Sequence, residues 1–177
     1  MMIYIGNKLQ NIEDIKQEDV RVDEIARSLS RQNRFLGHTR YPYSVAQHAV
    51  LTSYLCPEDL AYECLHHDDT EAYVGDLLGP LKRRMPEYRE IEHAVRAALC
   101  QPLRLAASAP AIKQYDTLAL VLEQCLVQGR ADIVFPYPPY GSITTFRELE
   151  HLVRQLHPKA AEKAYMDRHY ATLPGPQ

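Results

Sequence analysis

Apolar residues recur at intervals of three and four along nearly every periodic segment of this 177-residue chain. That spacing places them on one face of a helix, whereas a half-buried strand would need strict alternation. The most apolar helix is predicted over residues 111–128. Other helices are expected over 22–31, 44–55, 57–68 and 86–100, and after Thr145 and Pro158. We therefore predict an all-α bundle, in one domain spanning residues 1–177.

Two capping boxes mark helix starts, Ser44-Val-Ala-Gln47 and Thr145-x-x-Glu148. In each, the side chain of the first residue can accept a hydrogen bond from the backbone N–H of the fourth. The side chain of the fourth residue can accept one from the backbone N–H of the first. The opening residues 1–6 are expected to form a short strand or an extended arm. Irregular segments are expected as a linker at 102–110, a loop at 129–143 and a frayed tail at 174–176.

The overall charge and the cysteines narrow the class of protein. A formal net charge of −3 argues against a general nucleic-acid binder, which normally carries a basic face. No C-x-x-C pattern occurs among the four cysteines, so buried free thiols are expected rather than a disulfide framework. The sequence also lacks an apolar run long enough for a membrane span and a secretory-type start. We expect a cytoplasmic protein with no membrane partner.

Residues 65–76, Leu-His-His-Asp-Asp-Thr-Glu-Ala-Tyr-Val-Gly-Asp, contain a pattern suited to a divalent metal ion. His67 and Asp68 form an imidazole–carboxylate pair, which suits Zn, Co, Mn or Fe(II) better than a metal that prefers thiolates. Glu71 follows His67 by four residues and Asp68 by three, so a continuous helix would place all three on one surface. Two ligands do not complete a site, so others are expected from separate helices.

His48 and Asp116 lie on helical faces that otherwise look apolar. A buried carboxylate is costly unless it is paired or binds a metal, so Asp116 is a candidate ligand. The alternatives are a core histidine at position 48 and an ion pair between Asp116 and Lys113. Combined with His67 and Asp68, the two residues form a chelating set that a helical bundle can gather at its centre.

The ordered set His48…His67-Asp68…Asp116 resembles the metal signature of the HD-domain phosphohydrolases. Three motifs resemble the 5′-deoxynucleotidase branch and its phage-encoded relatives more closely: Ser44-Val-Ala-Gln-His48, His67-Asp-x-Thr-Glu71-Ala-Tyr-x-Gly-Asp76 and Pro80-Leu-Lys82. The resemblance covers residues 20–125. Asp69 and Gln47 depart from the commonest pattern, and neither is expected to bind the metal.

The resemblance implies a compact HD-domain helical bundle and a divalent transition metal, Co, Zn, Mn or Ni, held by His48, His67, Asp68 and Asp116. Mg²⁺ is a further option alongside the substrate phosphates. A metal-activated water would be the nucleophile. Glu71 is the candidate general acid/base, and the alternative for it is a surface carboxylate near a helix end.

Five residues are candidates for binding the substrate. Arg34 and Phe35 resemble the Arg–aromatic pair with which this branch contacts its substrate, through phosphate recognition and base stacking. Asp76 resembles the carboxylate that binds the sugar hydroxyl. Lys82 and His38 are candidate phosphate contacts, and the alternatives for them are a solvated charge and loop packing.

The predicted function is hydrolysis of deoxynucleotides, with two reactions open. One removes the 5′-phosphate of a deoxynucleoside monophosphate; the other acts on a dNTP, as in dATP-directed triphosphohydrolases. The resemblance also implies a homo-oligomer. The alternatives are a non-catalytic sensor that binds metal and nucleotide, and a helical interaction module without metal.

Overall fold

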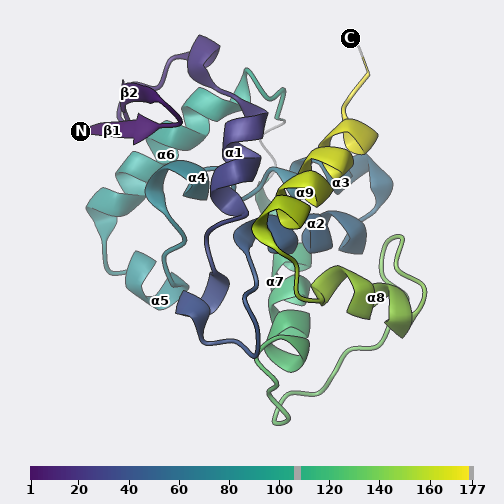
Figure 1. Cartoon of the computed structure of the whole chain (residues 1–177). Helices are drawn as coiled ribbons and strands as arrows, with labels where there is room; N and C mark the ends of the chain where they lie inside the picture. Colours follow the sequence, from purple (N-terminus) through teal and green to yellow (C-terminus); the bar gives the residue numbers. More distant parts are fainter. Residues whose placement is uncertain (106–108, 176–177) are drawn as a thin grey trace.

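Helix α2, residues Val45–Leu55, runs through the middle of the molecule (Figure 1). Ten of its eleven residues are buried, and Tyr54 is half-buried. A helix surrounded on all sides belongs in the centre of a bundle, and α2 contacts α3, α7, α8 and α9. The predicted capping box at its start is present: Ser44 accepts from the Gln47 amide, and Gln47 accepts from the Ser44 amide.

The computed structural model describes residues 1–105 and 109–175. Its helices confirm the predicted all-α architecture. In chain order they are α1 (Val22–Leu29), α2, α3 (Ala61–Leu65), α4 (Glu71–Val74), α5 (Gly79–Lys82), α6 (Pro86–Cys100), α7 (Ala109–Leu126), α8 (Phe146–Val153) and α9 (Pro158–Thr172), with 3-10 turns at Gln17–Asp19, Arg34–Gly37 and Glu58–Leu60. The second capping box, Thr145 with Glu148, opens α8 as predicted.

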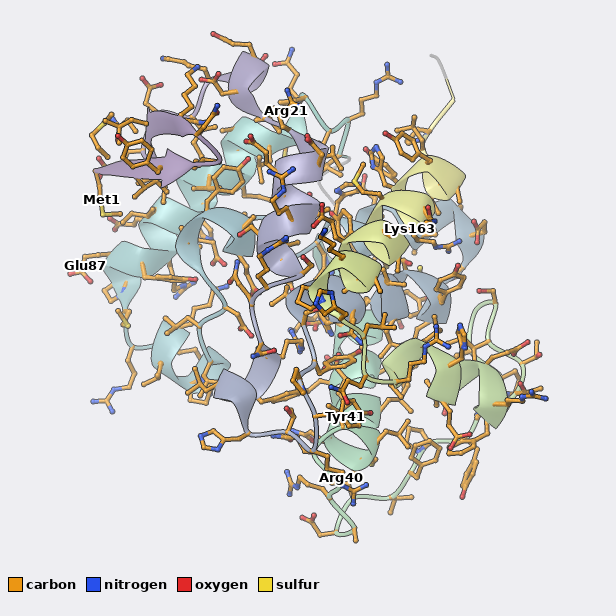
Figure 2. The ribbon with its side chains drawn as sticks, viewed as in Figure 1. Met1, Arg21, Arg40, Tyr41, Glu87 and Lys163 are labelled. Atoms are coloured by element: carbon orange, nitrogen blue, oxygen red, sulfur yellow. The ribbon has the colours of Figure 1, made fainter. Side chains whose placement is uncertain are left out.

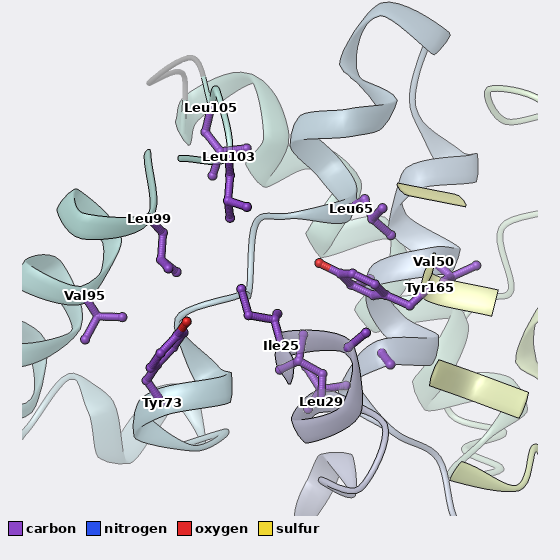
Figure 3. Close-up of a cluster of buried hydrophobic side chains, with 14 of the residues drawn as sticks. Ile25, Leu29, Val50, Leu65, Tyr73, Val95, Leu99, Leu103, Leu105 and Tyr165 are labelled. Carbon is purple, nitrogen blue, oxygen red and sulfur yellow. The ribbon is translucent and has the colours of Figure 1, made fainter. Parts of the chain in front are cut away.

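Two main apolar clusters pack on opposite sides of α2. The larger cluster joins α1, α2, α3, α6 and α9, and Figure 3 shows Ile25, Leu29 and Tyr165 within it. The second joins α2 to α7 and α8 through Leu51, Leu122 and other residues. These clusters pack α3 and α7 against the same central helix.

The opening residues form one strand of a hairpin, which agrees with the first of the two expectations for them. Strand β1 (Met2–Ile5) pairs antiparallel with β2 (Lys8–Asn11), and Ile3 and Ile5 of the hairpin pack against the larger apolar cluster (Figure 1). At the opposite end of the molecule, Arg40 and Tyr41 lie beside the end of α7 (Figure 2). The Arg40 amide donates to the Val127 carbonyl at 2.9 Å.

The prediction of one helix from Pro57 through Asp68, continuing to Glu71, is wrong. α3 ends at Leu65, residues 66–70 form a turn, and α4 starts at Glu71. The break has a local cause: His67 Nδ1 donates to the Cys64 carbonyl at 2.7 Å, the group that would accept from the Asp68 amide in a continuous helix.

Two other expectations concern the ends of segments. The linker predicted at 102–110 falls partly on residues 106–108, which lie outside the described residues, and α7 begins at Ala109. The tail predicted at 174–176 is irregular at 174–175, and residue 176 lies outside the description. Across the described part of the chain, none of the helices is both long enough and apolar enough to cross a membrane.

Candidate metal centre

Three segments far apart in the sequence bring four polar side chains to one point. His48 comes from α2, His67 and Asp68 come from the turn after α3, and Asp116 comes from α7. His48 Nε2 lies 3.2 Å from His67 Nε2 and 3.3 Å from Asp116 Oδ1. Asp68 Oδ2 lies 3.4 Å from His48 Nε2 and 3.1 Å from His67 Nε2.

This donor set fits a divalent transition metal. Single ligand atoms of His48, His67 and Asp116 all lie within 4.8 Å of one another, so the three could hold one ion. Asp68 Oδ2 also lies near both imidazoles, although among the described residues only His48, His67 and Asp116 form the mutually close group. Two imidazole nitrogens and two carboxylate oxygens suit Zn, Co, Mn or Ni.

Both imidazoles are held with Nε2 facing the other ligands. His67 Nδ1 donates to the Cys64 carbonyl, so its Nε2 keeps a free lone pair. His48 Nδ1 lies 2.7 Å from Glu123 Oε1, which fixes the same tautomer in the neutral ring. Metal-binding histidines commonly use their second nitrogen in this way, because the outer hydrogen bond orients the ring and makes it more basic.

Glu123 is a site residue that the sequence prediction missed. It is fully buried on α7, and its Oε2 accepts from Arg34 Nε at 3.2 Å and lies 3.0 Å from Arg34 Nη2 in an ion pair. The residue follows Asp116 by seven positions, about two helical turns, so both side chains lie on one face of α7. The sequence feature that could have identified Glu123 was a second acidic residue at that spacing on the most apolar helix.

The four candidate ligands shift each other's proton affinity. Burial disfavours a proton on His67, but Asp68 and Asp116 outweigh it and raise its pKa to about 9. Burial also favours protonated carboxyls, yet the two imidazoles hold the pKa of Asp68 and of Asp116 well below the usual range. Both carboxylates are therefore ionised, and the protons that favour the imidazoles lie where a cation could bind.

Glu71 lies at the first position of α4, three residues beyond Asp68, and is 7% exposed. Among the described residues its Oε2 is buried with no hydrogen-bond partner. Burial, together with the negative charges of Asp68 and Asp76, raises the pKa of this carboxyl well above its ordinary value. An acid of this kind can hold and release a proton next to the ligand group.

Arg34 is buried and turned toward the ligands. Its Nη1 lies 3.9 Å from Asp68 Oδ2, in addition to its ion pair with Glu123. Burial opposes its charge, but these two carboxylates outweigh burial and raise its pKa. Phe35 is half-buried, and its ring centroid lies 5.3 Å from Arg34 Cζ.

The backbone at this loop is strained. Phe35 and Leu36 have φ angles of 56° and 54°, in the left-handed region that side chains other than glycine rarely adopt. Two hydrogen bonds hold the loop: Arg34 N donates to the Tyr43 carbonyl at 2.9 Å, and Val45 N donates to the Gln32 carbonyl at 3.0 Å. Such strain persists where the surrounding structure fixes the backbone.

The other three predicted substrate residues, Asp76, Lys82 and His38, differ in burial and in bonding partners. Asp76 is half-buried; its amide donates to Gln32 Oε1, while Gln32 Nε2 donates to the Glu71 carbonyl. Lys82 forms an ion pair with Glu92. His38 is exposed, and within the described chain no contact joins its side chain to the ligand group.

A cavity of about 340 Å³ opens beside the candidate ligands. His67, Asp68 and Asp116 line one wall, and three basic residues also line it: Lys82, Arg96 and Lys113. Lys113 pairs with Asp116 Oδ2 at 2.5 Å, so the ion pair weighed as an alternative for Asp116 coexists with its approach to the histidines. A second cavity, of about 510 Å³, lies against α8 and contains none of the candidate ligands.

Two further histidines outside the candidate ligand set, His66 and His169, are both buried. His66 is fully buried and His169 is 7% exposed, and their rings share a hydrogen bond of 2.9 Å. Burial, followed by the nearby His66, lowers the pKa of His169 to about 4.

No family model matches the chain. Over 112 residues it is 43% identical to the uncharacterized protein YfdR of Escherichia coli (strain K12), which covers 62% of each chain. It is 28% identical over 112 residues to 5′-deoxynucleotidase PM0747 of Pasteurella multocida (strain Pm70), covering 61% of this chain and 56% of that protein. The chain thus matches less than two thirds of the length of either relative.

Proposed function

We propose that this protein is a metal-dependent phosphohydrolase that acts on deoxynucleotides. The observation that carries the proposal is the approach of His48, His67, Asp68 and Asp116 to one point, beside the buried carboxyl of Glu71. The similarity to a 5′-deoxynucleotidase supports it independently of that geometry. The resemblance of the ordered motifs to HD-domain phosphohydrolases supports the same class.

His48, His67, Asp68 and Asp116 would hold the metal, which we expect to be Co, Zn, Mn or Ni. When bound, the metal supplies Lewis-acid chemistry, because it lowers the pKa of a water and draws charge off a phosphoryl oxygen. Glu71 accepts a proton from the attacking water and can return one to the leaving oxygen. Its raised pKa suits this exchange better than that of an exposed carboxylate.

We assign substrate binding to the five residues that the sequence predicted for this role. Arg34 offers a guanidinium fork to a phosphate, and Phe35 offers a ring to the base. Asp76 accepts from a sugar hydroxyl. Lys82 and, farther out, His38 add positive charge for phosphate. Lys82, Arg96 and Lys113 line the neighbouring cavity together with Asp68, Glu92 and Asp116, so positive charge for a phosphate lies beside the candidate carboxylate ligands.

Two reactions fit this site: cleavage of a deoxynucleoside monophosphate to nucleoside and phosphate, and cleavage of a dNTP. Incubating the metal-free protein with each dNMP and dNTP, with and without Co²⁺, distinguishes them by whether phosphate, pyrophosphate or triphosphate is released. The proposal requires Co²⁺-dependent turnover of at least one deoxynucleotide. Metal and nucleotide binding without turnover of any of them would instead favour the sensor alternative.

We place the protein in the cytoplasm as a homo-oligomer. All four cysteines are free thiols, of which Cys56 and Cys64 are buried as predicted and Cys100 and Cys125 are half-buried. Free thiols agree with a reducing compartment. Analytical ultracentrifugation tests the oligomeric state, and a second copy would be detected as a doubled mass.

A further inference from the structure

The turn of residues 66–70, which carries His67 and Asp68, has little helical support of its own. It joins α3 and α4, which contain five and four residues. Helices this short are not stable alone, so tertiary contacts must fix the turn. Metal ligands need their positions fixed within fractions of an ångström, so these contacts bear directly on the site.

Asp69 is the residue of the turn that faces away from the ligands, into the protein. It is fully buried, and its Oδ2 accepts from His66 Nδ1 at 2.6 Å. Its Oδ1 accepts from the Tyr165 hydroxyl of α9, almost a hundred residues later in the chain. Figure 3 shows that hydroxyl pointing toward the segment between Leu65 and Tyr73.

His66 adds a second bond to α9 and extends the connection to α6. Its Nε2 lies 2.9 Å from His169 Nδ1 of α9, and its carbonyl accepts from Arg96 Nη1 of α6 at 2.8 Å. A buried carboxylate is tolerated because both of its oxygens are bonded, and losing either bond would leave it unsatisfied. The network therefore ties the turn to α6 and α9, neither of which supplies a candidate ligand.

We propose that Asp69 and Tyr165 are positioning residues of the metal centre. They hold the turn so that His67 Nε2 and Asp68 Oδ2 face His48, and neither touches the metal. The inference rests on the proposed metal site and adds that α9 controls its affinity. Removing a partner bonded directly to a ligand typically costs about 10–100-fold in metal affinity, and Asp69 and Tyr165 act one residue away through the backbone of the turn, so we expect a loss toward the lower end.

The test uses Tyr165→Phe and Asp69→Asn, with Tyr62→Phe as the matched control. Tyr62 belongs to the same apolar cluster as Tyr165, but its hydroxyl donates to the Leu103 carbonyl at 2.9 Å and not to the turn. Titration calorimetry of the metal-free proteins with Co²⁺ measures the Kd, at a temperature where circular dichroism shows each variant folded. We expect Tyr165→Phe and Asp69→Asn to raise the Kd about 10-fold or more, and Tyr62→Phe to leave it unchanged.

Activity supplies a second measurement. If the variants lose only metal affinity, excess Co²⁺ should restore their kcat. A structural defect or a lost catalytic group would keep kcat low at any Co²⁺ concentration. Should Asp69→Asn fail to fold, Tyr165→Phe, which removes a single oxygen, decides the matter.

Two results would overturn the inference: wild-type Kd in a folded Tyr165→Phe, or an equal rise in Kd for Tyr62→Phe. Failure of the proposed function looks different. If the wild-type protein binds Co²⁺ but hydrolyses no nucleotide, the enzyme assignment fails while the affinity comparison still decides the inference.

Discussion

The His48 ring is bonded through Nδ1 to Glu123 Oε1 at 2.7 Å, and both side chains are fully buried. Asp116 lies 3.3 Å from the other nitrogen of the same ring. Because Asp116 and Glu123 are seven residues apart on α7, one helix contacts both sides of one imidazole. This arrangement holds the His48 ring with its Nε2 facing Asp116.

Glu123→Gln tests that relationship. The amide keeps the shape and one acceptor but loses the charge that makes His48 more basic, so metal affinity should fall about 10–100-fold. Titration with Co²⁺ measures the change. Glu150→Gln, an exposed substitution of the same kind on α8, is the control and should bind metal as the wild type does. Equal affinity in the two variants would contradict the role given to Glu123.

Glu71→Gln separates chemistry from metal binding. Removing the acid/base should lower kcat about 10²–10⁴-fold. The Co²⁺ Kd should stay unchanged, because Glu71 is not among the candidate ligands. Thermal stability at neutral pH should stay equal or rise, since burial disfavours the charge of this carboxyl. Retained turnover would remove Glu71 from the mechanism.

The local sequence predicted most of the helices and, separately, a set of candidate ligands. Ser44 and Thr145 start helices because capping depends on residues only three apart. His48 and Asp116 were singled out because polar groups on apolar faces need partners. The structure brings them together with His67, as that hypothesis requires.

Tertiary contacts explain what the sequence could not predict. Asp69, in the turn at 66–70, accepts from the Tyr165 hydroxyl almost a hundred residues later, a contact that periodicity around the turn does not reveal. In the sequence Glu123 looks like an ordinary charged residue, and only the structure shows that it contacts both Arg34 and His48. Its seven-residue spacing from Asp116 was the only local signal.

Metal removal should destabilise the folded chain. Binding to the native state alone contributes about 2.7 kcal/mol at a ligand concentration of 100 Kd. For a chain of this length, that corresponds to a rise in Tm of about 5–10 °C. Differential scanning calorimetry of chelated and Co²⁺-loaded protein measures it. His67→Ala should show no metal-dependent rise, and a rise equal to that of the wild type would argue against His67 as a ligand.

Stability should also depend on pH through His169. Its pKa is about 4 in the folded protein, because burial and the nearby His66 disfavour its charge, and about 6.5 when unfolded. The unfolded chain therefore binds a proton that the folded chain does not between these values. The free energy of unfolding should fall as pH drops from about 6.5 to 4, by at most about 3 kcal/mol, and this contribution is constant above pH 6.5.

Urea unfolding of the wild type and His169→Gln across that range measures the effect. The glutamine variant should lose this part of the pH dependence, so the difference between the two proteins should shrink toward acid pH. Parallel curves for the two proteins would contradict the assignment.

The most direct measurement is anomalous diffraction at the cobalt edge from crystals of the Co²⁺-loaded protein. The account predicts one strong peak, about 2.0–2.2 Å from His48 Nε2, His67 Nε2 and carboxylate oxygens of Asp68 and Asp116. A peak bound by other residues, or these four side chains around no metal at full Co²⁺ loading, would contradict it.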